Sequence, residues 1–358
     1  MHLHLLIPDL LLPVDGEAAR LDALETLLAK GRRTPTPPLQ LERWLMDRFG
    51  VGSDHGNDND SAGDGQGGAA AYSLIGDGGD PADGIWLRAD PVHLRVDRDA
   101  LVLADASVFG IGADEARALA ATLNGHFGAA LQIDARQPGR WYARLPTAPQ
   151  IHCTPLGEVR GEPISGHLPS GQDGMHWHAL MNEVQMALHD HEVNQAREER
   201  GELPVNSLWF WGNGSFAPIG KRPFNLVFSD DPLARGLAVA SGGSGSPLPA
   251  GASAIQRATH TAGPAEGQAL VVLDALRAPA RYGDAQAWLR MAESIERDWI
   301  APSLAALRDG RIGMLTCHLP SALGGQRVET VRGDLRRFWR RRKPLSAHLA
   351  ERVADQTQ

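Results

Sequence analysis

The chain has 358 residues, 42% of them hydrophobic, and a formal net charge of −8 at pH 7. This length can bury one large core or two modest ones, and the negative charge argues against a broad nucleic-acid or membrane-binding surface, because both need an extended positive field. Two distant cysteines, Cys153 and Cys317, form no CxxC pair and indicate a reducing cytoplasm rather than a disulfide framework. No stretch is long and apolar enough to predict a transmembrane segment.

The first fifty residues predict the start of an α/β core. The apolar run Leu3–Leu12 is typical of a buried strand, Gly16–Leu28 of a helix, and Leu39–Phe49 of a second helix after the proline-rich stretch Thr34–Pro38. Residues 51–84 are then rich in Gly, Asp, Asn, Ser and Ala. Their apolar surface is too small to offset the entropy of ordering, so we expect a flexible low-complexity linker.

Residues 85–150 predict an inserted α+β subdomain. Short apolar runs of strand type surround one helix, Ala113–Leu123. The predicted strands are Ile85–Arg88, His93–Val96, Leu101–Leu103, Leu131–Asp134 and Trp141–Arg144. We expect the core to resume near residue 165, after a connection that contains Pro, Gly and Ser.

The segment Leu180–Lys221 predicts where a site lies. Helically spaced apolar residues are followed by the stop signal Gly201 and by the aromatic, apolar strand Val205–Trp211, which ends in a Gly-Asn-Gly loop containing Asn213. Open α/β sheets bind ligands at the carboxyl ends of their strands. Asn213 and Lys221 are therefore candidate ligand-binding residues.

The chain beyond this loop alternates strands and helices up to residue 330. Such alternation favours a mostly parallel sheet flanked by helices. The predicted elements are strand Asn225–Phe228, helix Pro232–Ser241, strand Ala269–Leu273, helix Ala285–Arg308 and strand Arg311–Cys317. Residues 1–50 and 165–330 thus predict one core, followed by a basic C-terminal tail at 331–358.

Several motifs resemble a known superfamily. HEVNQAREERGELPVNSLWFWGNG, LVFSDDPLARGLAVASG and TCHLP are similar to successive segments of archaeal-type cofactor-independent phosphoglycerate mutases. A closer resemblance, over nearly the whole chain, is to the bacterial family named after the regulation-of-pathogenicity-factors E protein (the Rpf E-type regulatory family), through ADPVHLRVDRD, EARALAATLN, LPSGQD and NEVQMALHDH. The resemblance implies an alkaline-phosphatase-like fold and a regulatory protein related to phosphoglycerate mutase.

The resemblance also implies a two-metal chemistry from whose ligand pattern this chain departs. In the superfamily, Asp and His ligands hold two divalent metals that activate a serine. The pattern D-E-A-G-H-x-G-D falls on residues 277–284, so Arg277 and Arg281 replace an Asp and a His, and arginine does not bind a dication. The Asp-Gly and Asp-His pairs of the superfamily fall on Asp9 with Leu10 and on Cys317 with His318.

These departures predict a catalytically degenerate protein with a regulatory or ligand-binding role. The two arginines supply fixed positive charge that can bind a phosphate-bearing small molecule, and no cofactor is then expected. The other interpretation is that they pair with Asp274, Asp284 or another nearby acid. The candidate ligand-binding residues are Asn213, Lys221, Arg277, Arg281 and His318.

An enzyme is the alternative prediction. A metal-dependent phosphomutase or phosphatase that uses Mn or Zn would need rearranged ligands, several of them within a few ångströms of each other. The candidate metal ligands are Asp9, Asp230, Asp231, Asp284 and His318.

The basic cluster in the tail predicts a third role. The stretch RGDLRRFWRRRK places Phe338 and Trp339 among arginines, a composition suited to an acidic protein, nucleic acid or a membrane surface. Basic residues are also ordinary on a terminal helix. The candidate residues for an acidic partner are Arg336, Arg337, Arg340, Arg341 and Arg342.

The remaining polar and aromatic residues of the central segment predict structural roles. Histidines two positions apart on a helix point in different directions, so His176, His178, His189 and His191 predict no zinc site. Asn194 and Arg197 are placed to lock a helix to adjacent backbone. Trp209 and Trp211 share one side of a strand and are typical of a core.

Overall fold

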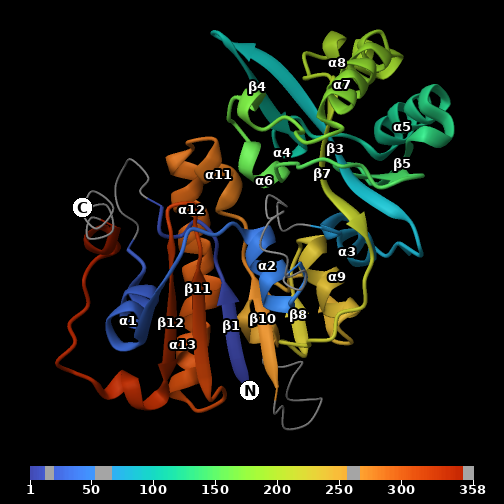
Figure 1. Ribbon diagram of the computed structural model, residues 1–358. Coiled ribbons are helices and arrows are strands. Elements are labelled where there is room, and N and C mark those ends of the chain that lie inside the picture. Colours follow the sequence, from blue (N-terminus) through green and yellow to red (C-terminus); the bar gives the residue numbers. More distant parts are fainter. Residues whose placement is uncertain (13–19, 53–66, 256–266, 350–358) are drawn as a thin grey trace. The chain divides into compact units, whose positions relative to one another are not determined.

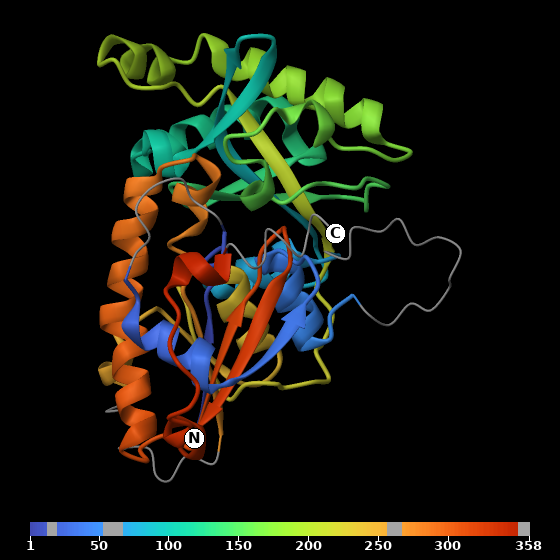
Figure 2. The ribbon, with the colours of Figure 1, turned by 90° about the vertical axis from the view of Figure 1, so that its left-hand side faces the viewer.

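The computed structural model describes residues 1–12, 20–52, 67–255 and 267–349 (Figures 1 and 2). By its internal contacts the chain divides into two compact units, unit 1 (Met1–Leu45 with Lys221–Gln358) and unit 2 (Met46–Gly220). Unit 1 is thus built from both ends of the chain and unit 2 from its middle. No helix in the described ranges is long and apolar enough to cross a membrane.

Unit 1 is built on a mostly parallel sheet in the order β2-β12-β11-β1-β10-β8-β9. Strand β12 runs antiparallel to its two neighbours, β11 and the edge strand β2, and the other strand pairs are parallel. The strands are β1 (His2–Leu6), β2 (Arg32–Thr36), β8 (Leu226–Phe228), β9 (Ser244–Ser246), β10 (Gln268–Val272), β11 (Met314–Leu319) and β12 (Gly325–Val331). The helices are α1 (Asp22–Lys30), α2 (Leu41–Phe49, which continues into unit 2), α9 (Pro232–Ala240), α11 (Arg277–Arg281), α12 (Ala285–Ile295), the π-helical η3 (Glu296–Ile300), α13 (Ala301–Arg308) and the 3-10 helix η4 (Arg332–Arg336).

Alternation along the central strand β1 gives the sheet two different faces. Leu3 and Leu5 belong to a hydrophobic core that also contains buried residues of α1, α12 and α13. His4 points to the other face, where the ring of Trp44 from α2 contacts His318 with 4.9 Å between ring centroids. The predicted mostly parallel sheet flanked by helices is confirmed.

Unit 2 is built on an antiparallel sheet in the order β4-β3-β6-β5, with β7 paired to β3. The strands are β3 (Ile85–Asp97), β4 (Ala100–Asp105), β5 (Gln132–Gln137), β6 (Arg140–Leu145) and β7 (Ser207–Ser215). The helices are α3 (Ala69–Gly76), α4 (Ala106–Phe109), α5 (Ala113–Phe127), α6 (Leu156–Val159), α7 (Gly174–His189) and α8 (Glu192–Glu199), with 3-10 helices η1 (Gly128–Ala130) and η2 (Ile164–Gly166).

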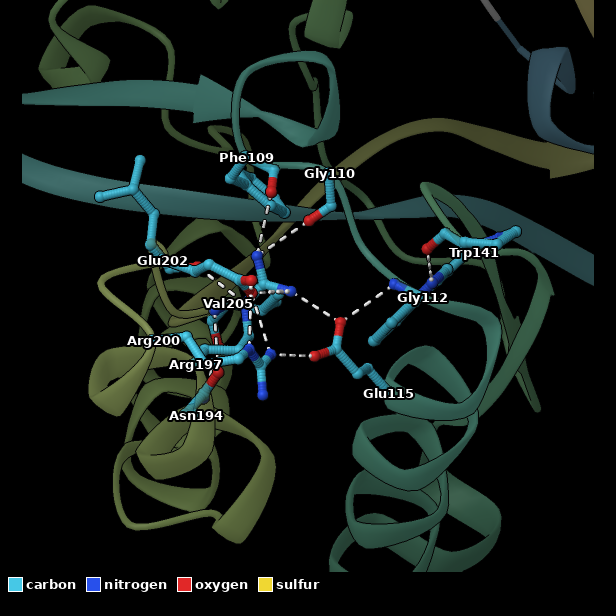
Figure 3. A network of polar contacts seen from close by, with 12 residues as sticks. Phe109, Gly110, Gly112, Glu115, Trp141, Asn194, Arg197, Arg200, Glu202 and Val205 are labelled. Carbon is cyan, nitrogen blue, oxygen red and sulfur yellow. Dashed lines mark hydrogen bonds and ion pairs between the residues drawn. The ribbon is translucent and has the colours of Figure 1, made fainter.

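Two side chains of α8 bind surrounding backbone, as predicted (Figure 3). Asn194 donates from Nδ2 to the carbonyls of Leu188 (2.7 Å) and Val205 (2.9 Å), and its Oδ1 accepts from the amide of Val205 (2.9 Å). The buried guanidinium of Arg197 donates to three backbone carbonyls and pairs with Glu115 of α5 at 2.6 Å. These bonds fix α8 to the start of β7 and to α5.

Two of the central histidines also have structural roles. His191 Nδ1 accepts from the amide of Val193 and so caps α8, at 3.1 Å, while its other ring nitrogen contacts Thr122 Oγ1 at 2.9 Å. His178 Nε2 bonds the carbonyl of Pro169 at 2.8 Å. Trp209 and Trp211 lie in the core, 1% and 5% exposed, as predicted.

The interpretation of Val205–Trp211 as a strand of the parallel sheet is wrong. The residues do form a strand, β7, but β7 pairs antiparallel with β3 inside unit 2. A nearly continuous apolar run is typical of any strand buried on both faces, so the pattern does not distinguish the two sheets. The argument that placed Asn213 at the carboxyl edge of a parallel sheet therefore fails.

Part of the predicted linker at residues 51–84 is also structured. Residues 53–66 lie outside the described residues. Ala69–Gly76 form helix α3, of which Ala69 to Leu74 are buried, and Ala70, Ala71 and Leu74 pack with Trp86 and Tyr142. Small alanine side chains allow a short helix to approach a sheet closely, and composition alone does not reveal the neighbours that cover it.

Several predicted boundaries differ from the elements observed. The predicted strands Ile85–Arg88 and His93–Val96 are one continuous strand, β3. The predicted connection at Thr34–Pro38 overlaps the edge strand β2, which tolerates Pro35 because an edge strand does not require every amide to donate. Residues 165–220, assigned to the core from the sequence, belong to unit 2 in the contact-based division.

Substitution of Asn194 by Ala is expected to destabilise unit 2 by about 2–4 kcal/mol, because it leaves buried backbone groups of Leu188 and Val205 without their partners. Urea unfolding followed by tryptophan fluorescence measures the change. The matched control is Asn182→Ala, an exposed position on α7, which is expected to change stability by less than about 0.5 kcal/mol. Equal effects of the two substitutions would contradict the locking role of Asn194.

Candidate functional site

Charged residues gather where the parallel strands of unit 1 end. Asp9 follows β1, Asp231 follows β8 and Asp274 follows β10. The carboxyl ends of parallel strands meet at one edge of a sheet, which is where such folds bind ligands. Glu42 of α2 and Arg277 and Arg281 of α11 interact electrostatically with these acids. We call these six residues the acid–arginine cluster.

The strongest interaction in the cluster is a buried two-pronged ion pair between Arg277 and Glu42. The two terminal guanidinium nitrogens lie 2.9 Å from the two carboxylate oxygens, and the residues are 5% and 4% exposed. Burial works against the charge of Arg277, but Glu42, Asp9 and Asp274 outweigh it and hold its pKa above the ordinary value. Arg277 is therefore a permanent cation among carboxylates.

Asp9 is held in a strained backbone conformation inside the cluster. Its φ angle is 60°, in the left-handed region that costs a non-glycine residue about 1 kcal/mol or more. Two hydrogen bonds fix this conformation. The amide of Asp9 donates to the carbonyl of Pro320 (2.9 Å), and the indole of Trp288 donates to the carbonyl of Asp9 (3.3 Å). Burial raises the pKa of the Asp9 carboxyl, and Arg277 and Arg281 partly offset this rise.

Asp231 has the most perturbed carboxyl of the candidate metal ligands. Its Oδ1 accepts from the amide of Ala234 at 3.0 Å and caps α9. Burial, and then the negative charges of Asp274 and Glu42, raise its pKa to about 6. Its neighbour Asp230 instead accepts from the amide of Leu248 at 3.1 Å.

His318 and Cys317 lie on opposite faces of β11. His318 Nε2 lies 3.1 Å from Nδ1 of His4, and the other nitrogen of His4 lies 3.1 Å from Gln268 Oε1. Cys317 belongs to the hydrophobic core, where burial and then Glu296 raise the pKa of its thiol to about 12. A neutral buried thiol is a poor metal ligand, since the thiolate is the coordinating form.

The structure brings some of the predicted site residues together and separates others. Arg277, Arg281 and Asp9 share the cluster. Asn213 belongs to unit 2, where its side-chain amide donates to the carbonyl of Ile151 at 3.4 Å, and Lys221 is an exposed residue of unit 1. Asp284 caps α12 by accepting from the amide of Ala287 at 2.8 Å.

Glu42 is the site residue that the sequence did not indicate. It lies in the first turn of α2, where an acidic residue is ordinary because it favours the helix dipole. Its partner Arg277 is 235 positions away. The suggestion that the arginines pair with a nearby acid is borne out for Arg277, with Glu42 as the acid. The side chain of Arg281 makes no hydrogen bond or ion pair with another residue in the described part of the chain.

The acids at this edge are in part already neutralised by a cation of the chain itself. Across residues 1–12, 20–52, 67–255 and 267–349, no group of three or more His, Cys, Asp or Glu side chains is arranged to hold a metal ion. The buried guanidinium of Arg277 already neutralises Glu42 and acts on Asp9 and Asp274, the acids that a cation here would need.

Comparison with a solved structure supports the fold of the chain. No protein-family model matches the chain. The PH0037 protein from Pyrococcus horikoshii has a similar structure, with a TM-score of 0.53 and 14% identity over 92% of this chain and 87% of that one. Unit 1 accordingly has the alkaline-phosphatase-like α/β fold, with a mostly parallel sheet flanked by helices.

Sequence comparison finds relatives of this chain among phosphoglycerate mutases. The chain is 30% identical over 242 residues to the 2,3-bisphosphoglycerate-independent phosphoglycerate mutase of Methanosarcina mazei, covering 63% of this chain and 57% of that protein. It is 31% identical over 169 residues to the probable 2,3-bisphosphoglycerate-independent phosphoglycerate mutase of Geobacter sulfurreducens, covering 44% and 41%. The matches thus span about half the length of these curated relatives. The chain is phosphoglycerate-mutase-like.

Replacing Arg277 by Met is expected to destabilise unit 1 by about 3–5 kcal/mol, because Glu42 then remains as a buried charge without its partner. The control is Arg290→Met, at an exposed position on α12, which is expected to be nearly neutral. Thermal and urea unfolding of both variants provide the measurement. A variant at position 277 as stable as the parent would show that the pair is not the neutralising contact.

The raised pKa of Asp231 predicts a dependence of stability on pH. The folded state binds this proton more tightly than an unfolded chain, in which the pKa is near 3.8, so the favourable contribution is complete below about pH 4 and is lost as the pH rises to about 6. The full loss is up to about 3 kcal/mol. Asp231→Asn keeps a capping side chain and is expected to raise the free energy of unfolding at pH 7 and to flatten its profile between about pH 4 and 6. Urea unfolding of the parent and the variant across this pH range measures the effect. If the free energy of unfolding of the variant depends on pH as steeply as that of the parent, the dependence does not come from Asp231.

Proposed function

We propose that the chain is a catalytically degenerate, phosphoglycerate-mutase-like protein with a regulatory or ligand-binding role, and that it takes a phosphate-bearing small molecule. The observation that carries the proposal is the buried Arg277–Glu42 pair at the carboxyl edge of the parallel sheet. It supplies a fixed cation at a position where the superfamily pattern has a metal ligand. A guanidinium does not coordinate a metal ion, and both carboxylate oxygens of Glu42 are already paired with Arg277.

Arg281 is the group we propose for contact with phosphate. Both terminal nitrogens of Arg277 are used by Glu42, whereas Arg281 is half-buried at the end of α11 and keeps its donors. A guanidinium can bind two phosphate oxygens at once. His318 lies on another strand and is in contact with His4, so it has no assigned contact with the ligand in this proposal.

Neighbouring acids set the conditions for anion binding. Asp9 and Asp231 have raised pKa values because of burial, and in their charged forms they repel an anion near Arg281. Anion affinity is therefore expected to increase as the pH falls toward about 6. Sulfate is a suitable probe alongside phosphate, because its charge is constant over this range.

The regulatory part of the proposal rests on the motifs that resemble the Rpf E-type family. A cytoplasmic location is proposed because the two cysteines lie far apart in the sequence and form no CxxC pair. A metal-dependent phosphomutase or phosphatase with Mn or Zn is the alternative function. The excess of acids over arginines in the cluster favours this alternative, because carboxylates with raised pKa values gain from a bound cation.

The experiment combines metal content, turnover and ligand binding of the purified chain. We expect no stoichiometric metal, no mutase or phosphatase activity with added manganese, and measurable binding of 3-phosphoglycerate and sulfate by calorimetry. Arg281→Gln is expected to weaken binding about tenfold or more, since a hydrogen bond to a charged group contributes about 1.5–3 kcal/mol.

Arg290→Gln removes the same charge from an exposed position of α12 and serves as the control, with affinity expected to remain within about twofold of the parent. Stoichiometric metal with turnover would establish the enzyme alternative. Absence of binding with absence of turnover would reject the phosphate ligand and leave only the degenerate fold.

A further inference from the structure

The basic segment after η4 is fixed along helix α1. Arg337 and Arg340 each donate at 3.1 Å to carbonyls at the carboxyl end of α1, those of Lys30 and Gly31 respectively. Arg342 bonds Asp22, the first residue of α1, at 3.0 Å. Cationic side chains at a helix carboxyl end are stabilised by its free carbonyls and dipole. We call residues 336–343 the basic strap.

Apolar contacts anchor the strap on both sides. Leu335 packs against the hydrophobic core of unit 1 from just before the strap, and Leu345, 1% exposed, is part of that core just after it. The strap itself has no regular helix beyond η4. Its shape is therefore set by these anchors and by the three arginines that bond α1.

The remaining side chains of the strap are displayed to solvent. Phe338 and Trp339 are 85% and 64% exposed, with ring centroids 5.2 Å apart in an edge-to-face arrangement. Arg336 and Arg341 are exposed, and their side chains make no hydrogen bond or ion pair with any residue in the described ranges. Two large exposed aromatic rings beside two free guanidinium groups are unusual for a surface without a partner.

We propose that the basic strap binds single-stranded nucleic acid. Exposed ring faces stack on bases, and guanidinium groups bind phosphates, without requiring a particular sequence. The net charge of −8 disfavours an extended anionic partner such as a bilayer or a duplex, because such a partner also meets the acidic remainder of the surface. A flexible single strand can contact the strap alone.

The chemistry of the strap favours this partner over the other anionic ones. An amphipathic helix with a continuous apolar face is the usual device for a membrane surface, and the strap is not helical. An acidic peptide uses the arginines but gains little from two exposed rings. Of the five arginines predicted for an acidic partner, Arg337, Arg340 and Arg342 already bond α1.

Fluorescence anisotropy of the full chain with a labelled oligo-U or oligo-dT of about twelve nucleotides tests the proposal, since one such surface spans about 4–16 nucleotides. We expect saturable binding that weakens roughly sevenfold between about 50 and 200 mM salt, as two phosphate contacts predict. Phe338→Ala with Trp339→Ala is expected to weaken binding roughly tenfold or more, and Arg336→Gln with Arg341→Gln to weaken it and to remove most of the salt dependence.

The matched control is Arg95→Gln with Arg98→Gln, two exposed arginines of unit 2 whose loss changes the net charge equally. Its affinity is expected to remain within about twofold of the parent. Binding unaffected by the aromatic substitutions, or equally reduced by the control, would overturn the proposal. Preferential binding to phosphatidylserine vesicles or to poly-glutamate would also overturn it. The same holds if neither oligonucleotide binds at the lower salt concentration. None of these outcomes depends on the phosphate site, because the strap variants leave the acid–arginine cluster intact.

Discussion

The cost of burying charge governs the carboxyl edge of the parallel sheet in unit 1. A parallel sheet brings the ends of several strands to one edge, and here Asp9, Asp231 and Asp274 follow three of those strands. Buried carboxylates near each other cannot all remain ionised without a cation. Arg277 supplies that cation and is held by both oxygens of Glu42. The proton affinity of Asp231 and the position of α11 both depend on this pair.

The core of unit 2 also buries an arginine–carboxylate pair, and there further polar and aromatic side chains surround the two charges. Arg88 pairs with Asp90 at 2.6 Å, the indole of Trp211 donates to the other oxygen of Asp90 at 2.8 Å, and Arg88 also lies over the rings of Tyr142 and Trp211. Together with Asn194 and Arg197, these contacts satisfy buried polar groups locally. They give the polar residues Asn194 and Arg197 a structural role.

The parts of the structure that depend on local pattern could be predicted from the sequence. Strand and helix periodicity identified α9 and β10 closely, and it located where β1 and α12 begin. Asp231 before Pro232 marks the start of α9. The predicted strand Leu3–Leu12 is longer than β1, and the predicted helix Ala285–Arg308 is divided into α12, η3 and α13. The partner of a strand could not be predicted, because a strand buried on both faces looks alike in parallel and antiparallel sheets. For this reason β7 was placed in the wrong sheet.

The candidate site residues that lie in a motif could also be predicted from the sequence, whereas their distant partners could not. Arg277 was found because a motif aligned it with a ligand position, but Glu42, its partner, has no local signal in α2. The burial of α3 was missed because low-complexity composition describes only the segment and not the sheet that covers it. Long-range neighbours therefore account for most of what the sequence alone could not supply.

A cation that belongs to the chain differs from one that is bound from solution. The guanidinium of Arg277 cannot dissociate, exchange for another ion or be removed by a chelator, and it stays protonated at any physiological pH. The positive charge that Arg277 supplies at this edge therefore does not vary with the supply of divalent ions in the cell. Its planar fork also has no vacant position that a substrate oxygen could enter, so the charge that holds the fold together is unable to serve as a Lewis acid.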